Sequence, residues 1–472
     1  MNIFIHRRDI RIHDNTTLIK MLNDLDEALT SIFIFTPEQI TNNPYFSNNL
    51  VQFMCLSLLQ LQKEYKKYKS NLYFFYGNYI SILEELNKVL NIKNIGFNAD
   101  YSPYSKKRDL EIKEWCINNK INCINEEDML LVNIINNKNY PNQSPYKVFT
   151  PFLKYQKSNF KVANINNKVS FLLHKLMNKT ESKTESKTES KRKFKYQIDT
   201  KKMKSFYKHN NYLAINPGRK EALNYLEDLK RQKEYNDLRN ILMYETSYLS
   251  AYINLGLLSI REVYWKAKEV LNESNTFINE LYWRDFYYNI LFHFPHIVGN
   301  SFNSKYDNIK WDNNEDLFEK WCKGITGFPI VDACMRQLNT TGYMHNRGRM
   351  IVASFLTKDL FIDWRWGEKY FATQLTDYNI SANNGGWQWA SGSGTDSQPY
   401  FRIFNPTTQI EKFDSDCLFI KKWIHELSSL SSKDIIKWET SYKNFTNINY
   451  PKPIVNHKER YNYTISNYKK YL

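Results

Sequence analysis

The sequence predicts two domains, an α/β domain built on a parallel sheet and a second domain made only of helices. Within the first 130 residues, short apolar runs alternate with helical patterns, which is typical of a parallel sheet covered by helices on both faces. From about residue 206 onward, apolar residues recur at helical spacing and strand-type alternation is absent. We therefore divide the chain into residues 1–131, a connecting segment of residues 132–205, and residues 206–472.

The strands of the first domain are expected at five apolar runs: Ile3–Ile5, Ala28–Phe35, Asn71–Tyr76, Ile92–Phe97 and Ile121–Ile124. A helical pattern over Leu50–Tyr68 lies between the second and third runs. No GxGxxG follows the first run, and GxxxxGK[ST] occurs nowhere in the chain. We expect a Rossmann-like sheet that lacks the usual glycine-rich fingerprint for a dinucleotide.

The connecting segment has a different composition from the two domains. Asn and Lys dominate it, and Lys179–Ser190 is three copies of Lys-Thr-Glu-Ser. Such a segment has too few apolar groups to offset the entropy lost when a chain is ordered. We predict a largely disordered insertion within an interdomain linker.

The charge and the cysteines restrict the class of protein. Lys and Arg number 65 against 49 Asp and Glu, a net charge of +16 that suits nucleic acid or an anionic membrane surface, although solubility alone also explains it. No apolar run reaches 18 residues, and Met1–Asp9 is not typical of a signal peptide. The six Cys form no CxxC pair and lie near no His at zinc-ligand spacing. We expect a soluble intracellular protein of the cytoplasm or nucleus, with reduced thiols, no membrane contact and no metal site.

Two groups of residues in the second domain recur at i, i+3 and i+4, so each group shares one face of a helix. In the first, Glu280, Trp283 and Arg284, burial beside an indole would keep the carboxyl protonated, whereas Arg284 would favour its ionised form. A structural Glu–Arg pair beside a core Trp is equally compatible with this spacing. The second group, Asn346, Arg349 and Met350, suits a base and a phosphate, with a basic surface helix as the alternative.

Two further segments carry groups that could bind a ligand. Thr246–Ser250 places hydroxyl groups before a helical run, where they cap the helix or bind a phosphate. Asp377–Trp389 contains carboxylate and amide groups for a ribose or heterocycle, and two Gly that permit close approach. Trp387 and Trp389 are two residues apart, so on a helix they face different ways. Trp residues crowd this half of the chain, which indicates either a large aromatic core or stacking on exposed bases.

Several long motifs, in order, resemble the photolyase/cryptochrome family, and most closely its class I cyclobutane pyrimidine dimer photolyases. The motifs are HRRDIRIHDN from His6, ELYWRDFYYNI, GFPIVDACMRQLNTTGYMHNRGRM, ASFLTKDLFIDWRWGE and NNGGWQWASGSGTDSQPYFRIFNPTTQ. They cover about residues 1–130 and 235–460. The resemblance implies an N-terminal α/β domain, a linker and a helical domain that holds FAD.

The resemblance also implies roles for individual residues. FAD would be held by Tyr235, Thr246, Ser247, Tyr248, Leu249, Ser250, Phe277, Arg284, Arg349, Asp377, Tyr378, Asn379 and Asn383. The dimer pocket would be formed by Glu280, Trp283, Asn346, Met350 and Trp389. An electron-transfer chain that photoreduces the flavin would consist of Trp387, Trp364 and Trp311. Contacts to DNA would come from Arg239, Glu280, Trp283, Arg284, Tyr287, Asn346, Arg347 and Gln409.

The implied activity is repair of ultraviolet-damaged DNA by a monomer, in which reduced FAD gives an electron to the dimer under blue light. A cryptochrome, a light sensor without repair, is the alternative; the chain ends shortly after the last motif, which favours repair. The single His345 argues against a 6-4 photolyase, whose members use a His pair there. Phe277 and Tyr343 stand where Trp is common in the family. The Asn-Glu pair of folate-binding members is absent from Tyr104–Lys107, so a folate antenna is not expected; a deazaflavin, a second flavin or no antenna stay open.

Overall fold

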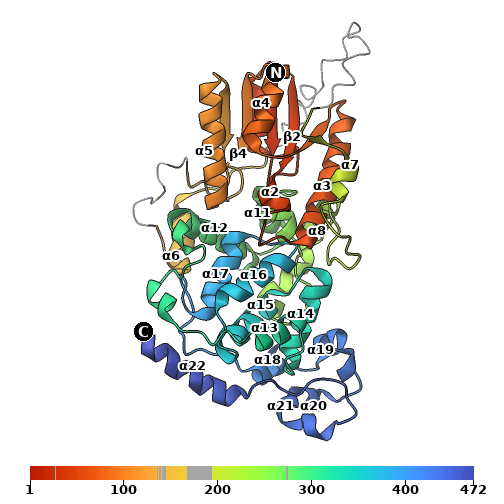
Figure 1. Ribbon diagram of the computed structural model, residues 1–472, viewed down its shortest axis with the longest axis vertical. Coiled ribbons are helices and arrows are strands. Elements are labelled where there is room, and N and C mark those ends of the chain that lie inside the picture. Colours follow the sequence, from red (N-terminus) through yellow and green to blue (C-terminus); the bar gives the residue numbers. More distant parts are fainter. Residues whose placement is uncertain are drawn as a thin grey trace.

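The computed structural model describes residues 1–26, 28–135, 137, 140, 145–166, 194–272 and 275–471. Two domains lie one above the other along the long axis of the molecule (Figure 1). The α/β domain contains the N-terminus, and the helical domain contains the C-terminus at the opposite end. The predicted fold class is confirmed.

The sheet of the first domain has six strands in the order β5-β4-β1-β2-β3-β6. All neighbours are parallel except β3 and β6, which are antiparallel. The strands are β1 (Asn2–His6), β2 (Leu29–Phe35), β3 (Leu72–Tyr76), β4 (Asn94–Asn98), β5 (Asn122–Glu126) and β6 (Gln197–Ile198). The first five match the predicted runs to within two residues at each end, whereas β6 comes from the connecting segment and was not predicted.

Both faces of the sheet are covered by helices. Along β2, Phe33 and Phe35 belong to one buried cluster, and Ile32 and Ile34 to another on the opposite face. These helices are α1 (Thr16–Asp24), α2 (Pro37–Ile40), α3 (Asn48–Lys67), α4 (Tyr79–Leu90) and α5 (Pro103–Asn118). A strand buried on both faces is apolar at most positions, which is why the runs in the sequence do not alternate.

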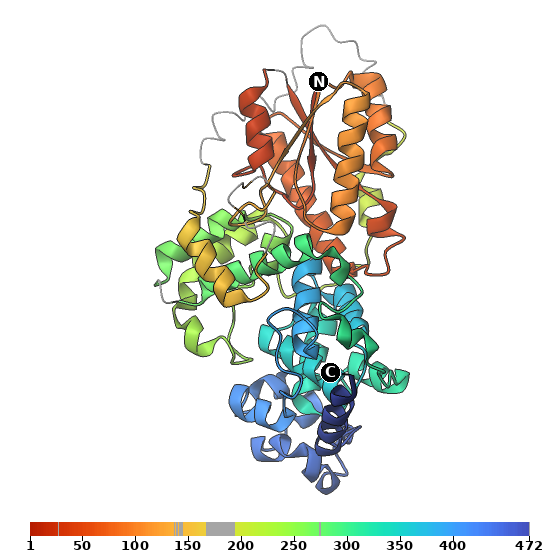
Figure 2. The same cartoon turned by 90° about the vertical axis from the view of Figure 1, so that its left-hand side faces the viewer.

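The connecting segment is more ordered than predicted. Helix α6 (Phe149–Asn159) and the short α7 (Thr200–Lys204) form within it. Helix α6 packs on the helical domain because its buried Phe149 and Phe152 contact aromatic rings of that domain (Figure 2). The prediction of a largely disordered segment is therefore wrong for α6, since composition averaged over the segment hides two apolar side chains with a tertiary partner. The repeat at Lys179–Ser190 lies outside the described residues.

The second domain is helical throughout its described residues. Its α-helices are α8 (Arg219–Glu227), α9 (Tyr235–Leu238), α10 (Ser250–Asn254), α11 (Ile260–Val270), α12 (Phe277–His293), α13 (Glu315–Lys323), α14 (Pro329–Thr341), α15 (Asn346–Ser354), α16 (Trp364–Gln374), α17 (Ile380–Ser391), α18 (Pro406–Phe413), α19 (Leu418–Trp423), α20 (Ser432–Ile436), α21 (Trp438–Ser441) and α22 (His457–Tyr471). Pro329 begins α14 and Gly342 ends it in the left-handed region.

Helix α17 is central to the second domain, because it packs against α12, α15 and α16. Ion pairs bury charge at the junction with the first domain, where Arg261 contacts both Asp14 and Asp128. Among the described residues, no helix is long and apolar enough to cross a membrane. In that same part of the chain, no group of His, Cys, Asp or Glu side chains is arranged to hold a metal ion.

Candidate functional site

One face of α17 is open although neighbouring helices surround this helix. Ala382 and Gly386, four residues apart, are both exposed, and a Cβ added at Gly386 would meet no atom within 4 Å. Gly385 lies against Tyr287, whose ring an added Cβ would approach to 2.2 Å. Gly385 is thus filled by packing within the protein, whereas Gly386 leaves space on the open face, and close approach of a ligand to the two Gly stays a prediction.

Polar groups from four segments meet near one end of α17. Arg349 donates to both carboxylate oxygens of Asp377, at 3.2 and 2.9 Å, and Ser250 donates to Asp377 at 2.7 Å. The Thr246 hydroxyl lies 2.9 Å from the Tyr343 hydroxyl. The hydroxyl groups of Thr246–Ser250 are not helix caps, because Leu249 is the N-cap residue of α10 and makes no side-chain cap. The side chains of this cluster are hydrogen-bonded to one another, and Ser250 is exposed to solvent.

Asn383 lies on α17 with its amide held by α16. Its Nδ2 donates to both the carbonyl oxygen and Oε1 of Glu368, each at 3.0 Å. Burial raises the pKa of Glu368 to about 7, while the hydrogen bond from Asn383 lowers it. The sequence motif contained Glu368, but its partnership with Asn383 depends on how α16 packs against α17.

Glu280 is paired with Arg239 rather than with Arg284. The guanidinium of Arg239 donates to Glu280 Oε1, and the two side chains are 37% and 36% exposed. Burial raises the pKa of Glu280, and Arg239 opposes that shift. The Glu280 carboxyl is thus partly desolvated by the protein and still reached by water. Arg284 bonds the Met129 carbonyl at 2.6 Å, so the structural Glu280–Arg284 pair that the spacing allowed does not form.

Trp283 has an aromatic support that sequence reasoning missed. Its ring stacks on Phe149 of α6, with centroids 3.7 Å apart and planes 9° from parallel. Phe149 is buried, whereas Trp283 is half-buried. Offset or parallel aromatic pairs stabilise one another beyond the area they bury. Trp283 is therefore held as a rigid platform. Sequence patterns contain no signal for this contact, because no periodicity connects α6 to α12.

Two residues of the predicted dimer pocket contact each other on α15. Asn346 Nδ2 lies 3.9 Å from the sulfur of Met350, and Asn346 is exposed. Trp389 on α17 is half-buried, whereas Trp387 is 2% exposed. The prediction that the two Trp face different ways is confirmed.

A group of arginines adjoins Glu280. Arg347 donates to Asn240 Oδ1 at 2.7 Å and lies 4.4 Å from the ring centroid of Phe413. Burial, together with the charges of Arg239 and Arg402, lowers the pKa of Arg347 to about 10. A guanidinium whose positive form is destabilised by other cations attracts an anion. Arg402 was not among the predicted DNA contacts, although it lies within the last motif.

The predicted electron-transfer residues lie on contacting elements. Trp387 packs against Gly367, where an added Cβ would come within 2.1 Å of the indole, and Gly367 is one turn after Trp364 on α16. Trp364 is 1% exposed, whereas Trp311 is half-buried. The Trp311 ring lies 5.0 Å from the ring of Phe361, three residues before Trp364. Their role in electron transfer stays a prediction.

Other predicted contacts have their hydrogen-bonding groups used inside the protein. Asn379 is the N-cap of α17, accepts from Ser381 and Ala382, and donates to Asn254 at 2.9 Å. Gln409 is 8% exposed, which leaves little of it for a DNA contact. Three other predicted cofactor residues contact aromatic rings. Tyr235 contacts Phe277 edge to face at 5.5 Å, and Tyr378 stacks on Tyr45. These assignments stay predictions, as does the expectation about folate at Tyr104–Lys107.

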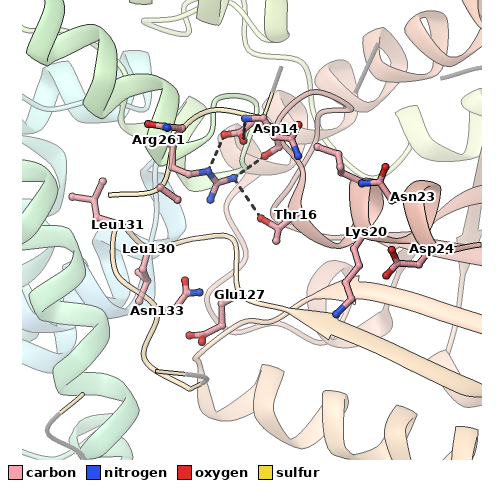
Figure 3. A pocket seen from close by; sticks show the side chains of 14 residues that line it. Asp14, Thr16, Lys20, Asn23, Asp24, Glu127, Leu130, Leu131, Asn133 and Arg261 are labelled. Atoms are coloured by element: carbon pink, nitrogen blue, oxygen red, sulfur yellow. Dashed lines mark hydrogen bonds and ion pairs between the residues drawn. The ribbon is translucent and has the colours of Figure 1, made fainter. Parts of the chain in front are cut away.

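A cavity of about 360 Å³ lies elsewhere, between the two domains. Figure 3 shows Arg261, Asp14 and Thr16 in its wall, joined by hydrogen bonds and ion pairs among themselves. Lys20 on the opposite side pairs with Glu126. The charged groups named here already have partners, and none of the predicted cofactor or dimer residues lines this cavity. It is not the candidate site.

The fold and the site define a two-domain protein whose helical domain contains an acid, a supported aromatic ring, a group of arginines and one helix with an exposed face. A family model described as DNA photolyase matches residues 2–169, and one described as the FAD binding domain of DNA photolyase matches residues 277–470. The chain belongs to the DNA photolyase family, and its cofactor is FAD.

Individual relatives agree with this assignment. A protein named deoxyribodipyrimidine photo-lyase from Synechococcus sp. is 33% identical over 97% of this chain and 94% of its own length. The crystal structure of an archaeal photolyase from Sulfolobus tokodaii with two FAD molecules is 37% identical, covers all of both chains and has a TM-score of 0.83. A cryptochrome from Synechocystis is 25% identical over 99% of this chain and 98% of its own, with a TM-score of 0.85.

The residues present fit FAD. The open face at Ala382 and Gly386 leaves space for a planar ring beside Asn383. The Arg349–Asp377 pair and the hydroxyl groups near it offer donors and acceptors for a ribose and a diphosphate. A GxGxxG fingerprint is not needed, because this cluster belongs to the helical domain and not to the first β-strand.

Proposed function

We propose that this protein is a deoxyribodipyrimidine photolyase, a carbon–carbon lyase that repairs cyclobutane pyrimidine dimers in DNA. The observation that carries the proposal is the pairing of Glu280 with Arg239 on the helix that also carries the supported Trp283. Arg239 belongs to a group of arginines, because its charge and that of Arg402 both act on Arg347. An acid, an aromatic platform and phosphate-binding cations are what a pyrimidine dimer flipped out of the duplex requires. Names of relatives at about one-third identity support the same activity.

The DNA backbone would be bound by the arginines. Arg239 and Arg402 are close enough to Arg347 to lower its pKa, so a phosphate near the three cations relieves repulsion. Arg347 is positioned for this by its hydrogen bonds to Asn240 and by its contact with Phe413. These contacts are independent of sequence and set where the strand lies.

The damaged bases would leave the duplex and enter the predicted dimer pocket. Extrusion costs less for a dimer, because its base pairs are already weakened. Trp283, rigid on Phe149, offers a stacking surface, and Trp389 offers a second one. Asn346 and Met350 lie together on α15 to contact the base edges. Glu280 in its protonated form donates a hydrogen bond to a dimer carbonyl and stabilises negative charge there.

When bound in its reduced form, FAD supplies one electron to the dimer under blue light and recovers it after the two cyclobutane carbon–carbon bonds have broken. The residues of this chain hold and orient the participants around that exchange. Arg349, Asp377 and Ser250 would bind the polar part of the cofactor. Asn383, whose amide is held by Glu368, would present its free carbonyl oxygen as a hydrogen-bond acceptor to the ring.

A cryptochrome function is the alternative, since a cryptochrome has the same fold. Repair is favoured by the dimer-pocket residues Glu280, Trp283, Asn346 and Met350. A light sensor needs no acid and no base-stacking platform there. The test is blue-light repair of a dimer-containing thymine oligonucleotide by the purified protein with its flavin reduced. We expect loss of the dimer and recovery of intact thymines. Unchanged dimer after illumination would exclude the proposed activity.

Glu280→Ala tests the acid separately. The repair yield per bound dimer should fall more than the affinity for DNA, because the side chain acts on charge that develops after binding. Glu280→Gln, which keeps one donor group, is the matched variant and should retain more of the yield. Equal yields per bound dimer in wild type and Glu280→Ala would show that the carboxyl only binds.

A further inference from the structure

The ion pair between Arg239 and Glu280 joins two groups to which the proposed function gives different partners. Arg239 follows α9 and would contact a phosphate, whereas Glu280 lies in the first turn of α12 and would contact a base. Each side chain is a little over one-third exposed, so solvent and DNA can reach both. An arginine held by this carboxylate cannot bind a phosphate with the same guanidinium edge. DNA binding and the ion pair therefore compete.

Arg239 is the cation that the described structure pairs with Glu280. Two further groups face this carboxyl, the phenols of Tyr235 and Tyr287, whose pKa values are raised by burial and by the Glu280 charge. Arg284 follows Glu280 by one turn, yet it contacts the Met129 carbonyl and Asp285. Without Arg239, burial alone acts on the carboxyl, and burial favours its neutral form.

The positive charges around Arg239 favour its release from Glu280 when a phosphate is present. Its charge and that of Arg402 both act unfavourably on Arg347, so the arginine group carries excess positive charge that one carboxylate does not neutralise. A phosphate placed among the three cations would interact with all of them at once. Of these three arginines, Arg239 is the one that the described structure pairs with the Glu280 carboxylate. Exchange of Glu280 for phosphate is therefore favoured when a strand arrives.

We propose that Arg239 transfers from Glu280 to a DNA phosphate on binding, and that Glu280 then takes up one proton from solvent. The ion pair breaks, the guanidinium stays positively charged against the phosphate, and the carboxylate becomes a carboxylic acid with an O–H that can donate to the dimer carbonyl. This inference rests on the proposed function and adds a coupling to it. Binding of the DNA phosphate backbone would thus lead to protonation of Glu280 only when DNA is bound.

The coupling predicts that binding consumes a proton. Linkage requires that affinity for dimer DNA then falls as pH rises, over the interval between the pKa of the paired carboxyl and that of the released one. Below this interval the carboxyl is protonated before binding, and above it the carboxyl stays ionised afterwards. In both cases proton uptake vanishes.

The test is calorimetric titration of the FAD-containing protein with a dimer-containing thymine oligonucleotide, in the dark. Titrations at about pH 7 in two buffers of different ionisation enthalpy give the number of protons taken up. We expect an uptake that approaches about one proton per bound dimer in the wild type. Glu280→Gln should bind with no uptake from this site. Arg239→Met should show reduced uptake, because Glu280 is already protonated in the free protein.

Arg347→Met is the matched control. It removes a cation from the same group, but Arg347 bonds Asn240 and not Glu280. Affinity and salt dependence should fall in this variant, while proton uptake persists. An uptake that is absent in the wild type, or equal in the wild type and Glu280→Gln, would overturn the proposed transfer.

Failure of the coupling differs from failure of the function. Repair of the same oligonucleotide by light without proton uptake would remove the coupling and leave the enzyme. Proton uptake without repair would keep the coupling and remove the enzyme. A protein that binds no dimer DNA would overturn both.

Discussion

The stacking of Phe149 beneath Trp283 predicts that the connecting segment controls recognition of the dimer. Phe149→Ala would remove a buried ring whose centroid lies 3.7 Å from that of Trp283. Replacing a buried Phe by Ala costs about 3–5 kcal/mol of folding free energy, and the lower end applies because Phe149 lies on a packed helix at the edge of the core. The loss of the aromatic pair itself accounts for about 0.5–1.5 kcal/mol.

We expect only the energy of the aromatic pair to appear in the binding free energy, because that pair holds Trp283 in position to stack on the dimer. The rest of the packing energy of Phe149 is lost equally by the free and the bound protein. The affinity for a dimer-containing oligonucleotide should therefore fall by about 2- to 12-fold, while the affinity for the undamaged strand changes little. Fluorescence anisotropy in the dark, with both strands, measures this ratio. Thermal unfolding measures the accompanying loss of stability.

Phe152→Ala is the matched control on the same helix. Phe152 is 1% exposed and contacts Phe286, with ring centroids 5.4 Å apart. It should destabilise the protein about as much as Phe149→Ala, yet preserve the preference for the dimer. If both variants lost that preference equally, or if Phe149→Ala kept it, the platform would not depend on Phe149.

Four further outcomes follow from the site. The pKa of Glu368 is raised to about 7, so its ionisation in the folded protein removes stability as pH rises from about 4.5 through 7; Glu368→Gln should therefore gain stability relative to wild type over that interval, measured by chemical unfolding. Trp311→Phe should block photoreduction of oxidised flavin, followed by absorbance, and spare repair by chemically reduced protein; a defect in the latter would exclude the electron-transfer assignment. Arg347→Met should reduce the slope of log affinity against log salt by about 1, since one phosphate contact is lost. Gly386→Ala should lower FAD affinity without unfolding the apoprotein, whereas Gly385→Ala should destabilise it by forcing a Cβ against Tyr287; equal FAD affinity in Gly386→Ala would place the cofactor elsewhere.

Much of the fold followed from local patterns in the chain. The five parallel strands could be predicted because strands buried on both faces are continuous apolar runs. The connecting segment was the failure, since α6 owes its order to contacts with α12 and not to its own composition. Short elements stabilised by tertiary packing leave a weak trace in the sequence.

For the candidate site, the sequence by itself determined which residues share a helix face and which chemical groups are available. Glu280 and Trp283 on one helix, and Asn346 and Met350 on another, follow from a repeat of 3.6 residues per turn. Only the tertiary structure decided which groups meet across helices: Arg239 with Glu280 and Phe149 with Trp283. The reason is physical, because helix periodicity fixes direction within an element, whereas contacts between elements depend on how whole cores pack together.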